Sequence, residues 1–255
     1  MFKISKYVIY DILRTKVILA YTLFLLAVSF MLFSLETDNS KSLASLLSII
    51  LITVPLISVV FTTTYFYNAY EFIELLVAQP LSRNSILLGE FWGVAGSMTV
   101  AFLIGIGIPV IIYSPTSTGF VLILSGVALS LSFISIAFLA SVAMRDKAKG
   151  IGMSLLLWLY FAIIYDAIVL GILFSFQDYP LDNAVIGLAS LNPIDMARIM
   201  VLMKMDVSAL MGFTGAVYKQ FFGSSLGFIY TMLLMLVWII FPLIASVRVF
   251  KKKNI

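Results

Sequence analysis

Hydrophobic residues occur in long uncharged runs, and each run is long enough to cross a lipid bilayer as a helix. A bilayer core needs about 20 mostly apolar residues. The longest run, residues 91–144, exceeds one span, and the turn-forming string YSPTSTG (113–119) divides it in two. The six predicted spans cover approximately residues 17–35, 43–67, 90–113, 119–144, 150–176 and 222–247. This pattern predicts an all-α polytopic membrane protein with a single transmembrane domain, residues 1–255.

The composition agrees with a membrane protein and argues against a soluble domain, an enzyme and a nucleic-acid-binding protein. Hydrophobic residues make up 62% of the chain and charged residues 11%, whereas soluble domains carry about a quarter charged residues. Because cysteine and histidine are both absent, the chain can form no disulfide, no thiolate or imidazole metal ligand, and no Ser–His or Cys–His nucleophilic pair. The phosphate-binding pattern GxxxxGK(S/T) is also missing. We therefore expect no enzyme, no cofactor in this chain and no nucleic-acid partner.

The distribution of lysine and arginine predicts the orientation in the membrane. Basic residues favour the cytoplasmic side of membrane proteins. With the N-terminus inside, only Lys41, Arg198, Lys204 and Lys219 fall outside, so that 12 of the 16 basic residues are inside. We therefore expect a multi-pass protein of the cell membrane with both termini in the cytoplasm.

Two shorter segments have the apolar spacing of amphipathic helices. Near the N-terminus, a helix lying at the inner membrane surface would group Ile4, Tyr7, Val8, Asp11, Ile12 and Leu13. Between spans two and three, residues 71–79 carry Phe72, Leu75 and Leu76 at helical spacing, and Pro80 ends the helix. This second helix either inserts into a groove on a partner protein or only completes span two at the membrane surface.

Asp166 is the one charged residue in the fifth predicted span and lies about midway along it. An ionised carboxylate at that depth costs several kcal/mol, and no other span offers a lysine or arginine to pair with it. Such a residue is a candidate for an intramembrane functional role. The alternative is a buried hydrogen bond between helices, for example to Ser, Thr or Tyr across a dimer interface.

A capped helix is predicted in the long external segment between spans five and six. Asn192 suits the N-cap, Pro193 the first helical position and Asp195 the first turn. Arg198 lies three residues after Asp195 and can pair with it. A second short helix is expected over residues 206–212. The residues Asn192, Pro193, Asp195 and Arg198 are therefore candidates for an external docking element.

Methionines lie along one face of the first external helix. Met196, Met200 and Met203 share that face by their spacing. Thioethers are soft ligands that suit Cu(I), which makes the three residues candidates for a copper contact. Methionine more often simply fills apolar packing surfaces, and this is the favoured interpretation.

The inner loop resembles a known element of membrane transporters. Glutamates followed by LLVAQPLSRNSILLG are similar to the coupling-helix region of ABC-2 type transporter permeases, and the six-span layout agrees over essentially the whole chain. The resemblance implies a homodimer and docking on a cytoplasmic ATP-binding cassette subunit, which would hold ATP and Mg²⁺. Glu90 departs from the family, because many relatives have a basic residue there. The implied coupling residues are Glu71, Phe72, Glu74, Leu75, Leu76, Gln79, Pro80 and Arg83.

Three further strings narrow the resemblance within that family. YDAIVLG (165–171), LNPIDMARI (191–199) and MGFTGAV (211–217) resemble NosY permeases, which belong to a system that supports copper-site assembly of nitrous oxide reductase. This implies coupling of ATP hydrolysis to transport or conformational work, and an external copper-processing partner of the NosD type. The alternatives are an ABC-2 exporter of a lipid, peptide or drug, and a membrane scaffold without a transport cycle.

Overall fold

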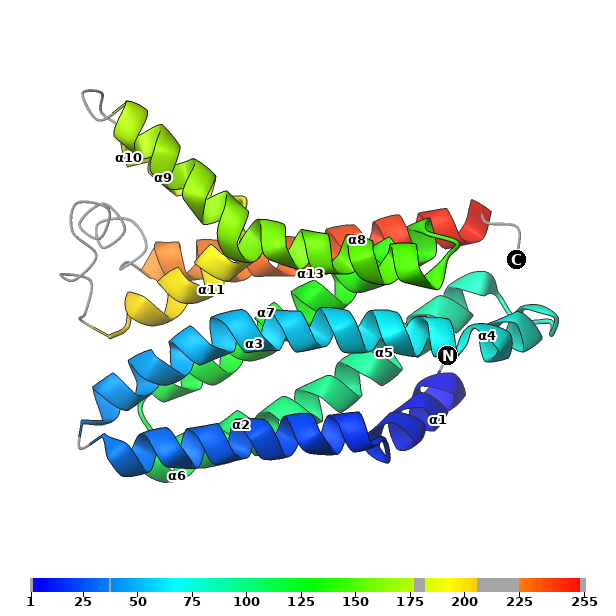
Figure 1. Cartoon of the computed structure of the whole chain (residues 1–255), viewed down its shortest axis with the longest axis horizontal. Coiled ribbons are helices and arrows are strands. Elements are labelled where there is room, and N and C mark those ends of the chain that lie inside the picture. The colour runs from blue at the N-terminus through cyan, green and yellow to red at the C-terminus, as the bar shows by residue number, and fades with distance from the viewer. Residues whose placement is uncertain (1, 37, 177–181, 206–224, 253–255) are drawn as a thin grey trace.

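The computed structural model describes residues 2–36, 38–176, 182–205 and 225–252, and the regular structure in these ranges is helical without strands (Figure 1). Within them, six helical segments are long and apolar enough to cross a membrane. They confirm the predicted all-α class. The six are α2 (Lys16–Leu35), α3 (Asn39–Asn68), α5–η1–α6 (Arg83–Phe102, Leu103–Gly107, Ile108–Tyr113), α7 (Ser117–Ala143), α8–η2–α9 (Lys147–Leu159, Tyr160–Ile164, Tyr165–Ser175) and α13 (Ser225–Lys252).

Polar side chains fix where five of these segments begin. An N-cap side chain accepts a hydrogen bond from one of the first backbone N–H groups, which have no partner inside the helix. Asp38 accepts from Ser40 at 2.9 Å, and Asp146 accepts from Lys149 at 3.0 Å. The five capping residues are Thr15, Asp38, Ser82, Thr116 and Asp146. The five capped segments begin one to seven residues before the predicted starts, and the largest difference is at α5, which begins at Arg83 where the span was predicted from residue 90.

The fourth span, α7, lies at the centre of the helical bundle. It packs against α3, α5, α8, α11 and α13. Of the residues in its most apolar stretch, 67% are buried, compared with 11% in the corresponding stretch of the fifth span. Serines let it approach its neighbours closely, and Ser130 hydrogen-bonds Ser58 of α3 at 3.1 Å. The fifth and sixth spans therefore form the periphery of the chain.

Two short helices lie at the end of the bundle where α13 ends (Figure 1). The first, α1 (Phe2–Leu13), packs against α5 and buries Val8 and Ile12 completely. Tyr7 and Leu13, which the predicted apolar face included, are exposed. The buried face of α1 is therefore narrower than the sequence pattern suggested.

The second, α4 (Tyr70–Val77), follows α3 almost without interruption. It ends two residues earlier than predicted, and Ala78–Ser82 lead into α5. The ring of Phe72 lies 5.4 Å from that of Tyr7, so the two short helices are in contact.

Gly93 allows the close approach of α1 to α5. A Cβ atom at this position would overlap Cγ1 and Cβ of Val8. We expect Gly93→Ala to lower the free energy of unfolding by about 1–3 kcal/mol, because an extra methyl group must displace a packed side chain. The measurement is the thermal unfolding midpoint of the purified protein in detergent. Gly152→Ala is the control, since nothing lies within 4 Å of the added carbon there; equal midpoints for the two variants would contradict the prediction.

Candidate functional site

The helix pair between the fifth and sixth spans forms a sharp elbow. The chain bends by 114° between helices α10 (Asp182–Ser190) and α11 (Pro193–Leu202), with Leu191 and Asn192 at the break. The sequence predicted α11 with its cap but gave no sign of α10, and the second helix predicted at 206–212 lies outside the described residues. We call residues 182–202 the elbow.

Helix α11 is not a surface helix, although the sequence placed it in an external loop. It packs against α7, α13 and α3, and seven of its side chains are buried. Near its C-terminal end, the hydroxyl of Thr118 at the start of α7 donates to the carbonyl of Lys204 at 3.3 Å. The elbow is therefore inserted among the spans and held by them.

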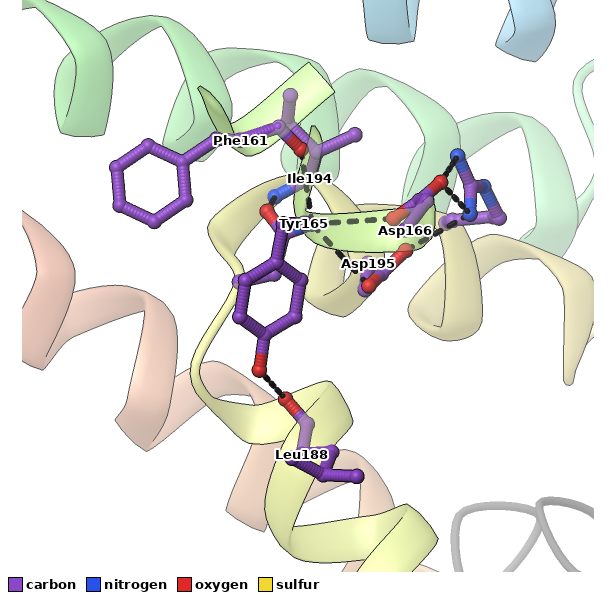
Figure 2. A network of polar contacts seen from close by, with 8 residues as sticks. Phe161, Tyr165, Asp166, Leu188, Ile194 and Asp195 are labelled. Carbon is purple, nitrogen blue, oxygen red and sulfur yellow. Dashed lines mark hydrogen bonds and ion pairs between the residues drawn. The ribbon is translucent and has the colours of Figure 1, made fainter. Parts of the chain in front are cut away.

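Asn192 joins the elbow to the fifth span. Its Oδ1 accepts a hydrogen bond from the N–H of Ile194 at 3.0 Å and so caps α11. Its Nδ2 donates to the carbonyl of Phe161 at 3.0 Å, and also lies 3.1 Å from Oδ2 of Asp195 and 3.4 Å from Oδ1 of Asp166 (Figure 2). The side chain is completely buried. One amide thus serves as acceptor for one helix and as donor to another, which a carboxylate at this position could not do.

Arg198 provides the positive charge that the other spans lack. Its Nη1 lies 3.2 Å from Oδ2 of Asp166 and 2.7 Å from Oδ1 of Asp195. The sequence showed no cation in another span for Asp166, and the structure places one there from the elbow, 32 residues further along. We call Asp166, Asn192, Asp195 and Arg198 the polar cluster.

The polar cluster holds two carboxylates and one guanidinium. Asp195 is the more enclosed acid, with 13% of its side chain exposed, compared with 30% for Asp166. Arg198 is shared between the two acids, so that with both carboxyls ionised the cluster would carry one net negative charge.

A π-helical turn, η2, positions the fifth span for these contacts. The wider turn, Tyr160–Ile164, includes the Phe161 carbonyl that accepts from Asn192. Such turns are rare and often occur at functional sites. The ring of Phe161 lies 5.2 Å from that of Trp238 on α13 and 6.2 Å from that of Phe133 on α7. Nothing in the residue pattern predicted this turn.

Side chains from two spans also hold the end of α10. The hydroxyl of Tyr165, next to Asp166, donates to the carbonyl of Leu188 at 2.5 Å (Figure 2). From α13, the indole of Trp238 donates to the carbonyl of Ser190 at 3.4 Å, and Tyr230 lies 3.0 Å from the Ser190 hydroxyl. The Ser190 carbonyl is among those that the last turn of a helix leaves without a partner inside the helix, whereas the Leu188 carbonyl also accepts from the N–H of Leu191 at 3.0 Å. The sequence analysis missed Tyr165, although its place beside Asp166 was a usable signal.

The residues predicted to form an external docking element differ in how much of their side chains is exposed. Asn192 and Pro193 are buried, and most of Asp195 is enclosed. Arg198 keeps 33% of its side chain exposed, and Leu191 at the bend is 59% exposed. A partner at the elbow would therefore meet Leu191 and Arg198 first.

The methionine candidates lie mostly in the core. Met196 is completely buried, Met200 is 3% exposed, and Met203 is half-buried against the same cluster of apolar side chains. Over the described residues, no group of three or more Asp and Glu side chains could hold a metal ion. In this conformation Met196 and Met200 have no free path to a metal ion in solution.

At the opposite end, α4 presents most of the predicted coupling residues. Leu75 is 66% exposed and lies beside the exposed Glu74. Phe72 is half-buried, Leu76 is buried, and Nη1 of Arg83 donates to the carbonyl of Lys251 at 3.1 Å. The remaining coupling residues, all exposed, are Glu71, Gln79 and Pro80.

Glu90, at the position where the resemblance to the family led us to expect a basic residue, does not reach this surface. It lies inside α5 with 1% of its area exposed. Neither carboxylate oxygen has a hydrogen-bond partner among the described residues. It therefore cannot contact a docked subunit in this conformation.

The match to a known family covers most of the chain. Residues 49–255 match the family described as ABC-2 family transporter protein. The chain belongs to this family and is the membrane subunit, or permease, of an ABC transporter. Membership implies a separate cytoplasmic ATP-binding subunit, to which the ATPase activity belongs.

Two similar proteins are both described as probable ABC transporter permease protein NosY. One, from Pseudomonas aeruginosa, is 28% identical over 188 residues, covering 69% of this chain and 68% of that protein. The other, from Stutzerimonas stutzeri, is 26% identical over 178 residues, covering 65% of this chain and 64% of that protein. The chain thus spans just under two thirds of the second relative. These matches confirm the resemblance to NosY permeases.

Charge balance in the polar cluster can be tested by paired substitutions. We expect Arg198→Gln to lower the free energy of unfolding by about 1–3 kcal/mol, because Asp166 and Asp195 lose a charged hydrogen-bond donor. Partial exposure of Arg198 and Asp166 keeps the loss moderate. Adding Asp166→Asn should recover part of the loss, since one negative charge is removed. Unfolding midpoints measure the effect; a double variant that loses as much as the two single variants together would contradict it.

The burial of the methionines leads to a separate expectation. Replacing Met196, Met200 and Met203 by Leu should leave Cu(I) uptake by the purified protein unchanged, because the side chains act in packing and Leu keeps their volume. Titration with Cu(I) in the presence of a competing chelator is the measurement. A triple variant that folds normally but loses uptake would identify the methionines as ligands instead.

Proposed function

We propose that this permease works in copper-site assembly of nitrous oxide reductase, as a homodimer with two cytoplasmic ATPase subunits and an external NosD-like partner. The observation that carries the proposal is the similarity to two NosY permeases. ATP and Mg²⁺ bind the partner ATPase, and both termini lie in the cytoplasm. The output is either substrate translocation or mechanical work on the external partner.

The geometry supports a mechanical route from the ATPase to the elbow. Helix α4, whose exposed Leu75 and Glu74 would meet the ATPase, is joined directly to α3. Helix α3 packs along α7, and α7 packs against α11. Closure of the ATPases on ATP would therefore tilt α4 together with α3, and α7 would pass the movement to α11. The polar cluster keeps the elbow attached to the fifth span during this movement.

Leu75 is the sharpest test of ATPase docking. We expect Leu75→Ala to weaken co-purification of the ATPase subunit about tenfold or more, because an exposed apolar side chain that follows Glu71 and Glu74 on the same short helix is suited to a central interface contact. Pull-down from native membranes in mild detergent measures it. Leu35→Ala is the matched control. Leu35 is also exposed, to 68%, but it is the last residue of α2 and so lies at the end of the bundle away from α4. Equal recovery of the ATPase with both variants would remove α4 from the interface.

The copper-related role is tested in the organism that makes the protein. Deleting the gene should leave nitrous oxide reductase deficient in copper while its polypeptide is still made. Copper content of the purified reductase is the readout. Returning the intact gene to the deletion strain should restore the copper content, and the Asp166→Asn gene should restore less of it. Fully copper-loaded reductase in the deletion strain would favour the alternative of an exporter unrelated to copper.

A further inference from the structure

A groove of about 720 Å³ runs between α2 and α3, at the end of the bundle that carries α1. Helix α2 packs against the third span (η1, α5 and α6) and also against α3, whereas α3 packs mainly against α7 and α8. Its lining residues come from the first half of α2 and the last half of α3: Thr15, Val17, Ala20, Tyr21, Phe24, Leu56, Ile57, Val60, Phe61, Thr64, Tyr65 and Asn68. Because both helices are membrane spans, the groove opens sideways into the bilayer.

Polarity changes along the groove in the direction expected for a lipid. Phe24, Leu56 and Ile57 line the deep end, whereas Thr15 and Asn68 lie at the end of the bundle. From Leu56 to Asn68 the helix rise gives a length of about 18 Å. One leaflet of the hydrocarbon core is about 15 Å deep. The groove thus has the length and polarity of one acyl chain with its ester region.

The shallow end of the groove is surrounded by cationic groups. Lys16 is exposed next to Thr15, and Nζ of Lys147 donates to Oδ1 of the groove residue Asn68 at 2.8 Å. The N-terminal end of α2 adds the partial positive charge of its unpaired N–H groups. Arg14 packs over the ring of Tyr10 at 3.8 Å. The nearby carboxylates are Asp11 on α1 and Glu90 on α5, both close enough to interact electrostatically with the groove residue Tyr65, and Asp146, which caps α8.

We propose that the α2–α3 groove holds one acyl chain of an anionic phospholipid, with the phosphate group against Lys16 and Lys147. The chain fills the apolar part beside Ala20 and Phe24, and the headgroup lies at the membrane surface beside Asn68. A lipid held there occupies the side of α3, the helix that continues into α4. The lipid would therefore be a structural partner of the permease that is distinct from any transported substrate.

Photochemical labelling tests the proposal on the full chain. The protein is placed in phosphatidylcholine nanodiscs with a small fraction of phosphatidylglycerol that carries a diazirine near the end of one acyl chain. We expect labelled peptides from α2 and α3 around Phe24 and Leu56, and about tenfold less label when phosphatidylcholine carries the diazirine. The double variant Lys16→Gln, Lys147→Gln should lose this tenfold preference, because each lysine near the surface favours an anionic lipid.

A groove-filling variant separates the groove from general lipid contact. Ala20→Trp places an indole in the groove and should abolish labelling at Leu56. Ala27→Trp is the matched control, because Ala27 is exposed two turns further along the same face of α2 and does not line the groove. Equal labelling in both variants would overturn the proposal. The proposal would also be overturned if Ala20→Trp made the protein monomeric and left the labelling unchanged. The groove would then be part of the contact between two copies of the chain.

Discussion

A membrane offers no water to a helix that bends, so every backbone group at the elbow must find a partner within the protein. Asn192 meets this constraint on both sides of the break, since it caps α11 and also donates to the Phe161 carbonyl in η2. Tyr165 and Trp238 satisfy carbonyl groups at the end of α10. The ion pairs of Arg198 depend on this arrangement, because only the bend brings α11 against the start of α9.

The polar cluster and α4 lie at opposite ends of one packed unit. Helix α7 contacts α3 over much of its length and also contacts α11, so a displacement at either end must be shared by the other. The two halves of the fifth span differ: α8 packs against α3 and α7, and Thr63 of α3 donates to the hydroxyl of Ser154 at 2.9 Å. Most of α9 faces away from the chain and is attached at the polar cluster. The α9 half is therefore the part of the bundle best placed to move relative to α7.

Local pattern was sufficient for the spans and for the start of α11. Uninterrupted hydropathy located the spans, and the string Asn192–Pro193 located a helix cap because both residues act within one turn. The pairing of Asp166 with Arg198 could not be predicted, since it depends on a fold that joins positions 32 residues apart. For the same reason the sequence did not show that Leu76 and Glu90 are buried. Periodicity finds an apolar face but does not tell what covers it.

The contact between Val8 and Gly93 has a consequence for the order of assembly. Helix α1 is synthesised before its docking site on α5, which follows some 80 residues later, after two spans. During that interval the apolar face of α1 has no protein partner. The membrane surface can hold such a helix in the meantime. The amphipathic character of α1 thus suits two successive environments, first the lipid surface during synthesis and then the side of α5.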